Sequence, residues 1–375
     1  RRPGPRHIEV PLDVAGVPFD AAVTPASETL LPTNSETDLA RAVELLEQAQ
    51  QPIILAGGGI RRSSALVQTL AEKLNAPVVQ TINARGLLHR HRLGVPASPS
   101  LEAVRDLIRG SDVVLALGTE LGPTDFDMYA TGNMPRMQNL IRVDVCAVQL
   151  ARRHCDLAIH GDGAEVARRL LAAITTSNNN GTGEARAAAA LAKAWEEIGP
   201  DMRAQSELLT VMREAVPNAL IVGDSTQPVY AGNLYYDHDR PAGWFNAATG
   251  FGALGYGIPA AIGAALAEPD APVICLTGDG SAQFSLPDLM SAKDEGVNVI
   301  FVVWNNHGYQ EIETSMEAVG VVPVGCDPTA PDFEAVAASC GLPYQRCTAT
   351  GSALASALSK ARNETGATMI EISAP

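Results

Sequence analysis

The sequence predicts an α/β protein with two domains, each built on a doubly wound parallel sheet. Its 375 residues exceed the roughly 300 residues at which a single hydrophobic core stops growing. Short apolar strands alternate with amphipathic helices along most of the chain, a pattern typical of parallel sheets. A polar, non-periodic stretch at residues 175–184, TTSNNNGTGE, interrupts this alternation and is predicted to link the two domains.

The first predicted domain covers residues 35–174. Ser35 is a candidate N-cap for a helix in which Leu39, Val43 and Leu46 recur at helical spacing. Short apolar strands and further helices then alternate. The predicted helices are 38–50, 65–74 and 101–108, and the predicted strands are 52–59, 76–81, 112–118 and 139–144.

The second predicted domain covers residues 185–375 and follows the same alternation. Its strands are mostly continuous apolar runs, as expected for strands buried on both faces of a parallel sheet. The predicted helices are 185–197, 206–215, 286–296 and 353–364, and the predicted strands are 219–223, 272–278, 297–306 and 368–373.

Charge and cysteine usage exclude several classes of partner. The chain carries 27 Lys and Arg against 42 Asp and Glu, a net charge of −15, and an acidic surface repels nucleic acids and anionic membranes. The six cysteines show no CxxC spacing, which argues against a zinc site and a disulfide framework. The uncharged stretch 246–267 is rich in glycine and contains Pro259, so we predict a buried loop and helix there and no membrane span. We expect a cytoplasmic protein.

Residues 1–34 are predicted to be the end of another domain and a linker. HIEVPLDV, at residues 7–14, has the apolar character of a buried strand, but no preceding segment could pair with it. We therefore expect that an N-terminal part of the protein is missing from this chain.

The segment from Gly278 to Gly308 contains the polar residues most typical of a functional site. GDGS, at residues 278–281, ends one predicted strand, and NN, at residues 305–306, ends the next. Open α/β sheets bind ligands at the carboxyl edge where both motifs lie. Asp279 could bind a divalent metal, Asn306 could add a neutral oxygen, and the N–H groups of Gly280 and Ser281 could contact a phosphate. The alternative is that Asp279 caps a helix and Asn306 lies in a turn.

GDGS followed by NN resembles the thiamine diphosphate motif of the acetolactate synthase and pyruvate decarboxylase superfamily. The resemblance implies that Mg²⁺ is held by Asp279, by the side-chain oxygen of Asn306 and by the backbone carbonyl of Gly308. Such a ligand set suits magnesium, which prefers a few protein oxygens together with phosphate oxygens and water.

Two further segments resemble the same superfamily. In TGFGALGYGIPAAIG, residues 249–263, the resemblance implies that the Gly252 carbonyl accepts a hydrogen bond from the coenzyme's amino group and that Leu254 wedges between its two rings. In GDSTQP, residues 223–228, Ser225 and Thr226 could donate hydrogen bonds to the diphosphate. A glycine-rich turn before a helix, and simple helix caps, are the alternatives.

The superfamily also needs a glutamate that activates the coenzyme, and that residue lies in a separate N-terminal pyrimidine-binding domain. Residues 4–14 resemble the last strand of that domain, so we expect the rest of it to be missing. Accordingly we assign no catalytic residue in this chain and predict that the chain alone is inactive. Because a neighbouring subunit would supply the glutamate, we expect a homodimer or homotetramer.

The glycines at positions 57–59, which follow a predicted strand, raise the possibility of a bound dinucleotide. GGGIRR departs from GxGxxG at its last glycine, and no acidic residue is placed convincingly for a ribose. Some members of the superfamily hold FAD in this domain and most hold nothing, so we do not expect FAD.

The substrate is predicted from the residues after the NN motif. Pyruvate decarboxylases read GYTIE where this chain reads GYQEI at residues 308–312, which puts simple pyruvate decarboxylation in doubt. Gln310 and Glu311 are the candidate substrate residues, and a carboxylate in an apolar pocket favours a cationic substrate. Together GDSTQPVY, WFNAATGFGALGY and NNHGYQEIE resemble decarboxylases of the 2-oxo acid 5-guanidino-2-oxopentanoate.

Several other interpretations stay open. Glu311 could be a solvated helix residue. The enzyme could be an acetolactate-synthase-like carboligase or a benzoylformate-type decarboxylase. The chain could also be a noncatalytic module for coenzyme binding or assembly. A nicotinamide-dependent oxidoreductase would fit the parallel sheets but would not explain GDGS together with NN.

Overall fold

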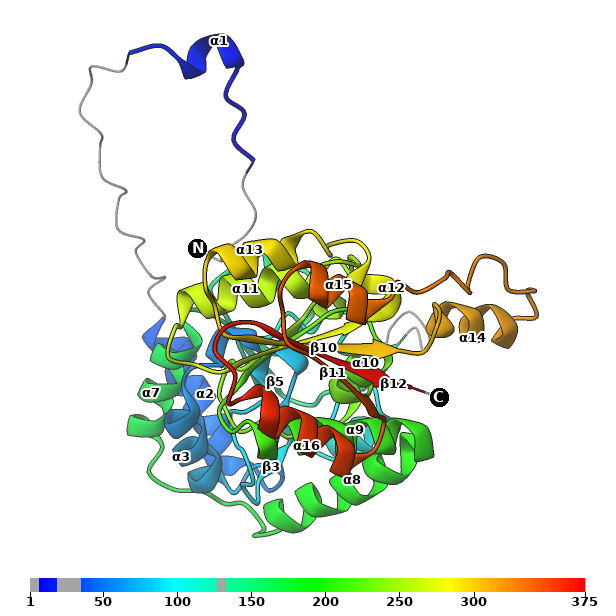
Figure 1. Ribbon diagram of the computed structural model, residues 1–375. Coiled ribbons are helices and arrows are strands. Elements are labelled where there is room, and N and C mark those ends of the chain that lie inside the picture. Colours follow the sequence, from blue (N-terminus) through cyan, green and yellow to red (C-terminus); the bar gives the residue numbers. More distant parts are fainter. Residues whose placement is uncertain (1–6, 19–34, 127–132, 375) are drawn as a thin grey trace.

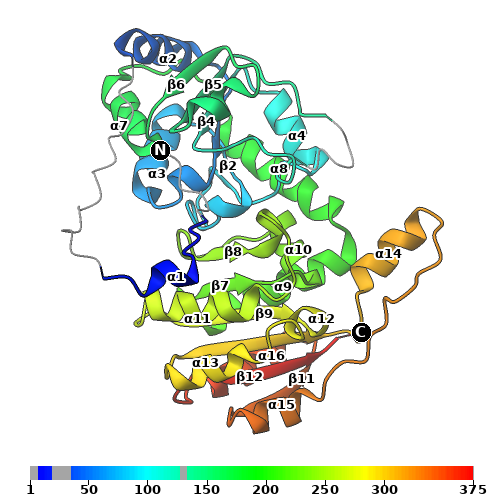
Figure 2. The same cartoon turned by 90° about the horizontal axis from the view of Figure 1, so that it is seen from above.

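A computed structural model describes residues 7–18, 35–126 and 133–374. It contains two six-stranded sheets in which every strand pair is parallel, with strand orders β3-β2-β1-β4-β5-β6 and β11-β12-β10-β9-β7-β8. The two sheets and their helices form neighbouring layered domains (Figure 2). The predicted fold class is confirmed.

The first sheet is covered by helices on both faces, because its strands alternate between two apolar cores. In β1, Ile54 and Ala56 face one core while Ile53 and Leu55 face the other. Helices α2, α3 and α7 cover the first face, and α4 and α8 cover the second. The strands are β1 (Pro52–Ala56), β2 (Val78–Gln80), β3 (Gly94–Val95), β4 (Val113–Leu117), β5 (Leu140–Asp144) and β6 (Leu157–His160), and the helices are α2 (Glu36–Gln48), α3 (Ser64–Leu74), α4 (Glu102–Arg109), α6 (Ala147–Ala151), α7 (Gly163–Ala173) and α8 (Gly183–Glu197), with short 3₁₀ turns η1 (Gly58–Ile60) and η2 (Ile82–Ala84).

The second sheet follows the same plan. Helices α9, α10 and α16 cover one face, and α11, α13 and α15 cover the other (Figures 1 and 2). In both views α14 projects away from the body of the molecule, and it has no buried residue. The strands are β7 (Leu220–Gly223), β8 (Trp244–Asn246), β9 (Val273–Gly278), β10 (Val299–Asn305), β11 (Tyr344–Thr348) and β12 (Thr368–Ser373), and the helices are α9 (Gly199–Ala215), α10 (Gln227–Leu234), α11 (Gly257–Ala267), α12 (Asp279–Ala282), α13 (Asp288–Asp294), α14 (Gln310–Ala318), α15 (Phe333–Ser339) and α16 (Gly351–Ala361), with the 3₁₀ turn η3 (Ala247–Thr249).

Local capping explains where several helices begin. The Ser35 hydroxyl accepts a hydrogen bond from the Asp38 N–H at 3.3 Å, which confirms the predicted N-cap of α2. The Asp162 carboxylate accepts from the N–H groups of Ala164 and Glu165, both at 3.0 Å, and caps α7 in the same way.

The two domains are joined by packed side chains as well as by the chain itself. Helix α8 follows the polar segment 175–182 yet packs on the first sheet, where Arg186 Nη1 donates to the Pro52 carbonyl at 3.2 Å. Arg85, which is buried, donates from the first domain to the carbonyls of Asn233 at 2.9 Å and Tyr236 at 3.2 Å in the second. A buried guanidinium bonded in this way fixes the second domain against the first.

One predicted element is wrong, and several were not predicted. His7–Val10 are exposed without regular structure, and α1 (Leu12–Ala15) is a short exposed helix, so residues 7–14 do not form a buried strand. An apolar run forms a strand only where another strand can pair with it; here none of the described strands does. The remainder of the predicted terminal segment, residues 1–6 and 19–34, lies outside the described residues. Strands β3, β6, β8 and β11 were not predicted because they are short or have a partly polar pattern.

The stretch 246–267 forms η3, a loop and α11, so the predicted loop and helix are present. The loop is not buried as predicted, because residues 250–253 are exposed and Phe251 is 98% exposed. Within the described parts of the chain, no helix has the length and apolar character needed to cross a membrane.

The glycines at 57–59 have a structural role in this fold. The Gly59 N–H donates to the Gly118 carbonyl at 2.9 Å. A Cβ atom on Gly57 would lie 2.4 Å from the Gly118 oxygen and 2.6 Å from the Thr119 Cα, which are backbone atoms that cannot move aside easily. Close approach of the loops after β1 and β4 therefore accounts for Gly57 and Gly59.

We expect Gly57→Ala to lower the free energy of unfolding by about 1–3 kcal/mol, because the new methyl group overpacks a backbone contact. Gly263→Ala is the matched control: nothing lies within 4 Å of its Cβ position in α11, so the change should leave stability unchanged or raise it by up to about 1 kcal/mol. Urea unfolding measures both. A Gly57→Ala chain as stable as the parent would contradict the close approach.

Candidate functional site

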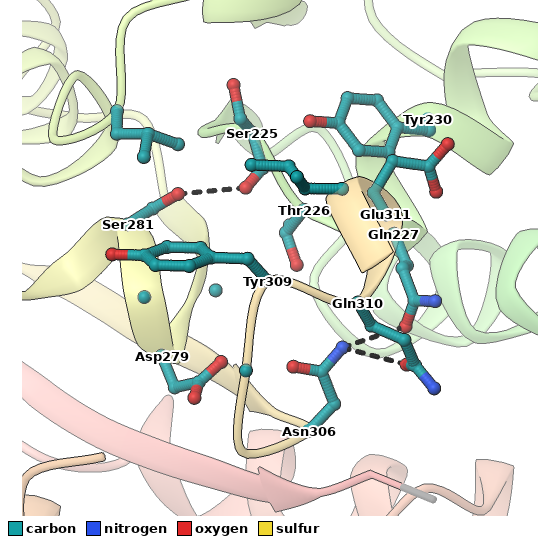
Figure 3. A pocket seen from close by; sticks show the side chains of 15 residues that line it. Ser225, Thr226, Gln227, Tyr230, Asp279, Ser281, Asn306, Tyr309, Gln310 and Glu311 are labelled. Atoms are coloured by element: carbon teal, nitrogen blue, oxygen red, sulfur yellow. Dashed lines mark hydrogen bonds between the residues drawn. The ribbon is translucent and has the colours of Figure 1, made fainter. Parts of the chain in front are cut away.

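Most of the predicted site residues lie at the carboxyl ends of three neighbouring strands. In the second sheet β10, β9 and β7 are adjacent and parallel, so the segments that follow them meet at one edge. There they line a cavity of about 70 Å³. Its lining includes Ser225, Thr226 and Gln227 after β7, Gly278, Asp279, Gly280 and Ser281 at the end of β9, Asn306, Gly308, Tyr309, Gln310, Glu311 and Ile312 after β10, and also Tyr230 and Leu254 (Figure 3).

The orientation of the Asn306 side chain decides the chemistry of this cavity. The Trp304 indole N–H, which can only donate, lies 3.2 Å from Gln227 Oε1, and this contact fixes that atom as the glutamine oxygen. The same oxygen lies 3.1 Å from the Asn306 amide. The Asn306 atom facing Gln227 must therefore be its nitrogen, which also donates to Gln310 Oε1 at 3.0 Å (Figure 3).

With this orientation three oxygen atoms converge. Asn306 Oδ1 lies 3.2 Å from Asp279 Oδ1 and 3.0 Å from the carbonyl oxygen of Gly308. Turning the amide over would place its nitrogen among these oxygens, but it would also press its oxygen against Gln227 Oε1 and Gln310 Oε1. Because acceptors repel one another when no donor lies between them, the arrangement is suited to a cation.

The Asp279 carboxylate supports the same interpretation. The residue is 1% exposed, and its Oδ2 atom has no hydrogen-bond partner among the described residues. Burial raises the pKa of Asp279, although backbone N–H groups of Gly280 and Asn306 act in the opposite direction. A carboxylate, an amide oxygen and a backbone carbonyl are hard ligands of the kind that Mg²⁺ binds. These residues therefore fit the metal that the sequence predicted.

The segments around the cavity leave little space for side chains. Ser281 Oγ donates to the Ser225 carbonyl at 2.8 Å and ties the end of β9 to the end of β7 (Figure 3). A Cβ on Gly280 would lie 2.4 Å from the Tyr309 ring, and one on Gly278 would lie 3.2 Å from Thr226 Oγ1. The Gly280 position therefore has no room for a side chain unless the Tyr309 ring moves.

The segment predicted to contact the middle of the coenzyme is only partly in the cavity. Leu254 lines it, whereas Gly252 is not among the lining residues and is exposed, with φ of +75°. Asp224 anchors the end of this segment: its carboxylate accepts from the N–H groups of Gly257 at 2.7 Å and Ser225 at 2.8 Å. Asp224 is buried, and burial raises its pKa.

The two candidate substrate residues occupy different positions. The Gln310 side chain accepts from the Asn306 amide, so it supports the proposed metal ligand. Glu311 is exposed on α14 and reaches the mouth of the cavity beside Tyr230 (Figure 3). Gln227, Tyr230 and Trp304 were not assigned from the sequence; Gln227 lies within the GDSTQP motif, and Trp304 directly precedes NN.

Two family models match the two domains. The model described as "Thiamine pyrophosphate enzyme, central domain" matches residues 39–170, and "Thiamine pyrophosphate enzyme, C-terminal TPP binding domain" matches residues 222–372. The chain belongs to the thiamine pyrophosphate enzyme family. The second match contains the GDGS and NN motifs and thus the converging oxygens.

Relatives of this thiamine pyrophosphate enzyme chain include decarboxylases and acetolactate synthases. A probable 2-ketoarginine decarboxylase, AruI, of Pseudomonas aeruginosa is 32% identical over 344 residues, which cover 88% of this chain and 60% of AruI. Acetolactate synthase isozyme 1 large subunit of Escherichia coli is 28% identical over 329 residues, covering 81% of this chain and 55% of that subunit. The chain thus spans little more than half the length of these relatives.

A solved structure has the same fold. The thiamine diphosphate-dependent 4-hydroxybenzoylformate decarboxylase of Rhodococcus jostii RHA1 superposes with a TM-score of 0.72 at 25% sequence identity, covering 92% of this chain and 66% of that protein.

We expect Asp279→Asn to stabilise the metal-free chain at pH 7. Because burial raises the pKa of Asp279 above its ordinary value of 3.8, the folded state binds the proton more tightly than the unfolded state, and the ionised carboxylate lowers stability above that pH. The stability advantage of Asp279→Asn over the parent chain should shrink as the pH falls from 7 towards 4, because the Asp279 carboxylate then becomes protonated. Urea unfolding between pH 4 and pH 7 measures the difference.

Added Mg²⁺ should make the parent chain more stable than Asp279→Asn. At ten times the dissociation constant a ligand adds about 1.4 kcal/mol to the free energy of unfolding, and only the chain with Asp279 should gain it. Asp270→Asn, which changes an exposed carboxylate, is the control and should respond to Mg²⁺ like the parent. Equal stabilisation of Asp279→Asn by Mg²⁺ would contradict the assignment.

Proposed function

We propose that this chain holds thiamine diphosphate and Mg²⁺ for the decarboxylation of a 2-oxo acid. The observation that carries the proposal is the convergence of the Asp279, Asn306 and Gly308 oxygens at the end of the thiamine pyrophosphate domain's central strands. These three residues would hold Mg²⁺. The N–H groups of Gly280 and Ser281, with the hydroxyls of Ser225 and Thr226, would face the diphosphate.

Leu254, which lines the cavity, and Gly252, which lies in the neighbouring loop, would orient the coenzyme. Leu254 would support its bent form, and the Gly252 carbonyl would accept from its amino group. When bound, the coenzyme supplies the electron sink that stabilises the carbanion left by loss of carbon dioxide. We also propose a homodimer or homotetramer whose subunits carry the pyrimidine-binding domain that this sequence does not contain, so that a neighbouring subunit supplies the activating glutamate.

The proposed substrate is 5-guanidino-2-oxopentanoate, which is 2-ketoarginine. Glu311 lies at the mouth of the cavity, where its carboxylate could bind a guanidinium through paired hydrogen bonds. The Tyr230 ring lines the same cavity and could contact the cation. AruI, the relative at 32% identity, is named a probable 2-ketoarginine decarboxylase, and this supports the same substrate class.

A carboligase of the acetolactate synthase type is the second candidate, supported by the relative from Escherichia coli at 28% identity. It would convert pyruvate to acetolactate and would not need a cation-binding side chain. A decarboxylase of benzoylformate-like acids is supported by the Rhodococcus structure. A noncatalytic coenzyme-binding module would bind thiamine diphosphate without turnover.

Calorimetric titration with thiamine diphosphate tests the first part of the proposal. Binding should require Mg²⁺ and should be lost in Asp279→Ala, because a hard carboxylate ligand is removed. Asp270→Ala is the control. Binding that is unaffected by Mg²⁺ and by Asp279→Ala would contradict the proposed site.

Thermal shifts of the coenzyme-loaded chain test the substrate class. 5-Guanidino-2-oxopentanoate should bind more tightly than 2-oxohexanoate, which is uncharged at its far end. Glu311→Gln should weaken the guanidino acid by about tenfold, since hydrogen bonds to charged groups contribute about 1.5–3 kcal/mol. Glu313→Gln, an exposed change on the same helix, should have no effect.

Product analysis then separates the candidates. Carbon dioxide from the guanidino acid supports the decarboxylase, and acetolactate formed from pyruvate supports the carboligase. Because the activating glutamate is predicted to lie outside this sequence, the assay includes the pyrimidine-binding domain that supplies it; coenzyme binding there without product from any of these acids would support a noncatalytic role. Equal affinity for the charged and uncharged acids would contradict the role of Glu311.

A further inference from the structure

We propose that Glu371 and Asn305 are positioning residues for the metal ligands. The buried Glu371 carboxylate orients the Asn305 amide. Asn305 then stabilises the turn that positions the oxygens of Asn306 and Gly308. The inference rests on the proposed metal site, and it assigns a task to residues that do not themselves line the cavity.

Glu371 lies inside the second sheet, close to the end of β10. It is 4% exposed, and its Oε1 atom accepts a hydrogen bond from Asn305 Nδ2 at 2.8 Å. On β12 it lies opposite Val303, two residues before Asn305 on β10. Residues in this diagonal relation project from the same face of a parallel sheet, which explains how two residues so far apart in sequence come into contact.

The carboxylate fixes which way the Asn305 amide points. An ionised carboxylate only accepts hydrogen bonds, so the Asn305 nitrogen faces Glu371 and its oxygen faces the following turn. There Asn305 Oδ1 accepts from the His307 N–H at 3.2 Å. Side chains of asparagine commonly stabilise turns in this way, through the N–H two residues further on.

The turn that Asn305 stabilises is unfavourable without such support. His307 has φ of +61°, in the left-handed region that a non-glycine residue seldom occupies. This conformation turns the chain back so that the Gly308 carbonyl comes within 3.0 Å of Asn306 Oδ1. The backbone at His307 therefore determines the distance between two of the three proposed metal ligands.

The second oxygen of Glu371 is held independently of the metal site. Oε2 accepts from Arg346 Nη2 at 3.0 Å and Arg346 Nε at 3.2 Å, and it also accepts from the Tyr344 hydroxyl. Arg346 lies directly opposite Glu371 in the pairing of β11 with β12. A buried carboxylate is stable only when its oxygens are bonded in this manner, and these partners keep it fixed before any metal binds.

Residues that orient metal ligands without touching the metal typically contribute 10–100-fold to metal affinity. Loss of Asn305 or Glu371 should therefore weaken metal binding even where the fold is kept. A bond that serves only the sheet would, in contrast, change the stability of the chain and leave the affinity as it is.

The test is a titration of the intact chain with Mn²⁺ alone, in which the electron paramagnetic resonance signal of the free ion gives the dissociation constant. We expect Asn305→Ala and Glu371→Ala to raise this constant by about 10–100-fold. Glu371→Gln keeps an oxygen for the Asn305 amide and should retain most of the affinity. Unfolding midpoints of all variants report the stability separately.

Asn298→Ala is the matched control. Asn298 directly precedes the first residue of β10, at the end of the strand away from Asn305. Its Oδ1 accepts a hydrogen bond from the Gly366 N–H at 2.7 Å. The substitution removes a comparable asparagine hydrogen bond far from the proposed ligands, so Mn²⁺ affinity should not change.

Three outcomes overturn the proposal. The first is a Mn²⁺ affinity in Asn305→Ala and Glu371→Ala equal to that of the parent chain, whether or not their unfolding midpoints are lower. Asn305 and Glu371 would then have a structural role only. An equal loss in Glu371→Gln and Glu371→Ala would show that charge, and not orientation, matters. Absence of Mn²⁺ binding by the parent chain would remove the metal site as well, so that the two failures are distinguishable. If Glu371→Ala does not fold, Asn305→Ala and Glu371→Gln carry the test.

Discussion

The arrangement of the site depends on one constraint, the indole N–H of Trp304. Because this group can only donate, it fixes the oxygen of Gln227, and Gln227 then fixes the amide of Asn306. The Asn306 oxygen is left facing Asp279 and the Gly308 carbonyl with no donor among them. A cation would relieve the repulsion among these acceptors most directly, and Mg²⁺ is the cation that we propose.

The fold places these side chains at an edge of the sheet that a ligand can reach. Strands β7, β9 and β10 are parallel neighbours in the sheet, and their carboxyl ends bring together residues that are distant in sequence. Helices packed on both faces bury the strands and leave polar groups at this edge, which is where open α/β sheets bind ligands. The adjoining α14 has no buried residue, so it can adjust to a ligand at lower cost than the strands.

Much of the fold was predictable because most of the inner strands are continuous apolar runs, whereas β3, β6, β8 and β11 are short or partly polar. The resemblance of GDGS and NN to the superfamily motif implied Asp279, Asn306 and Gly308 as metal ligands, and the structure brings their oxygens together. The predicted strand at residues 7–14 was wrong because none of the described strands pairs with this segment, and an apolar run without a partner strand stays irregular or helical. The roles of Gln227 and Glu371 could not be predicted, because they depend on contacts with residues 79 and 66 positions away in the chain. Gln310 was assigned to the substrate, but its bond to Asn306 depends on a side-chain orientation that sequence does not encode.

The central claim is that Asp279, Asn306 and Gly308 form a cation site with the Asn306 oxygen directed inward. A crystal structure of the chain with Mn²⁺, with anomalous diffraction recorded at the manganese edge, tests it most directly. We expect an anomalous peak within bonding distance of Asp279 Oδ1, Asn306 Oδ1 and the Gly308 carbonyl. A peak elsewhere, or an Asn306 amide turned so that its nitrogen donates to Asp279, would contradict it.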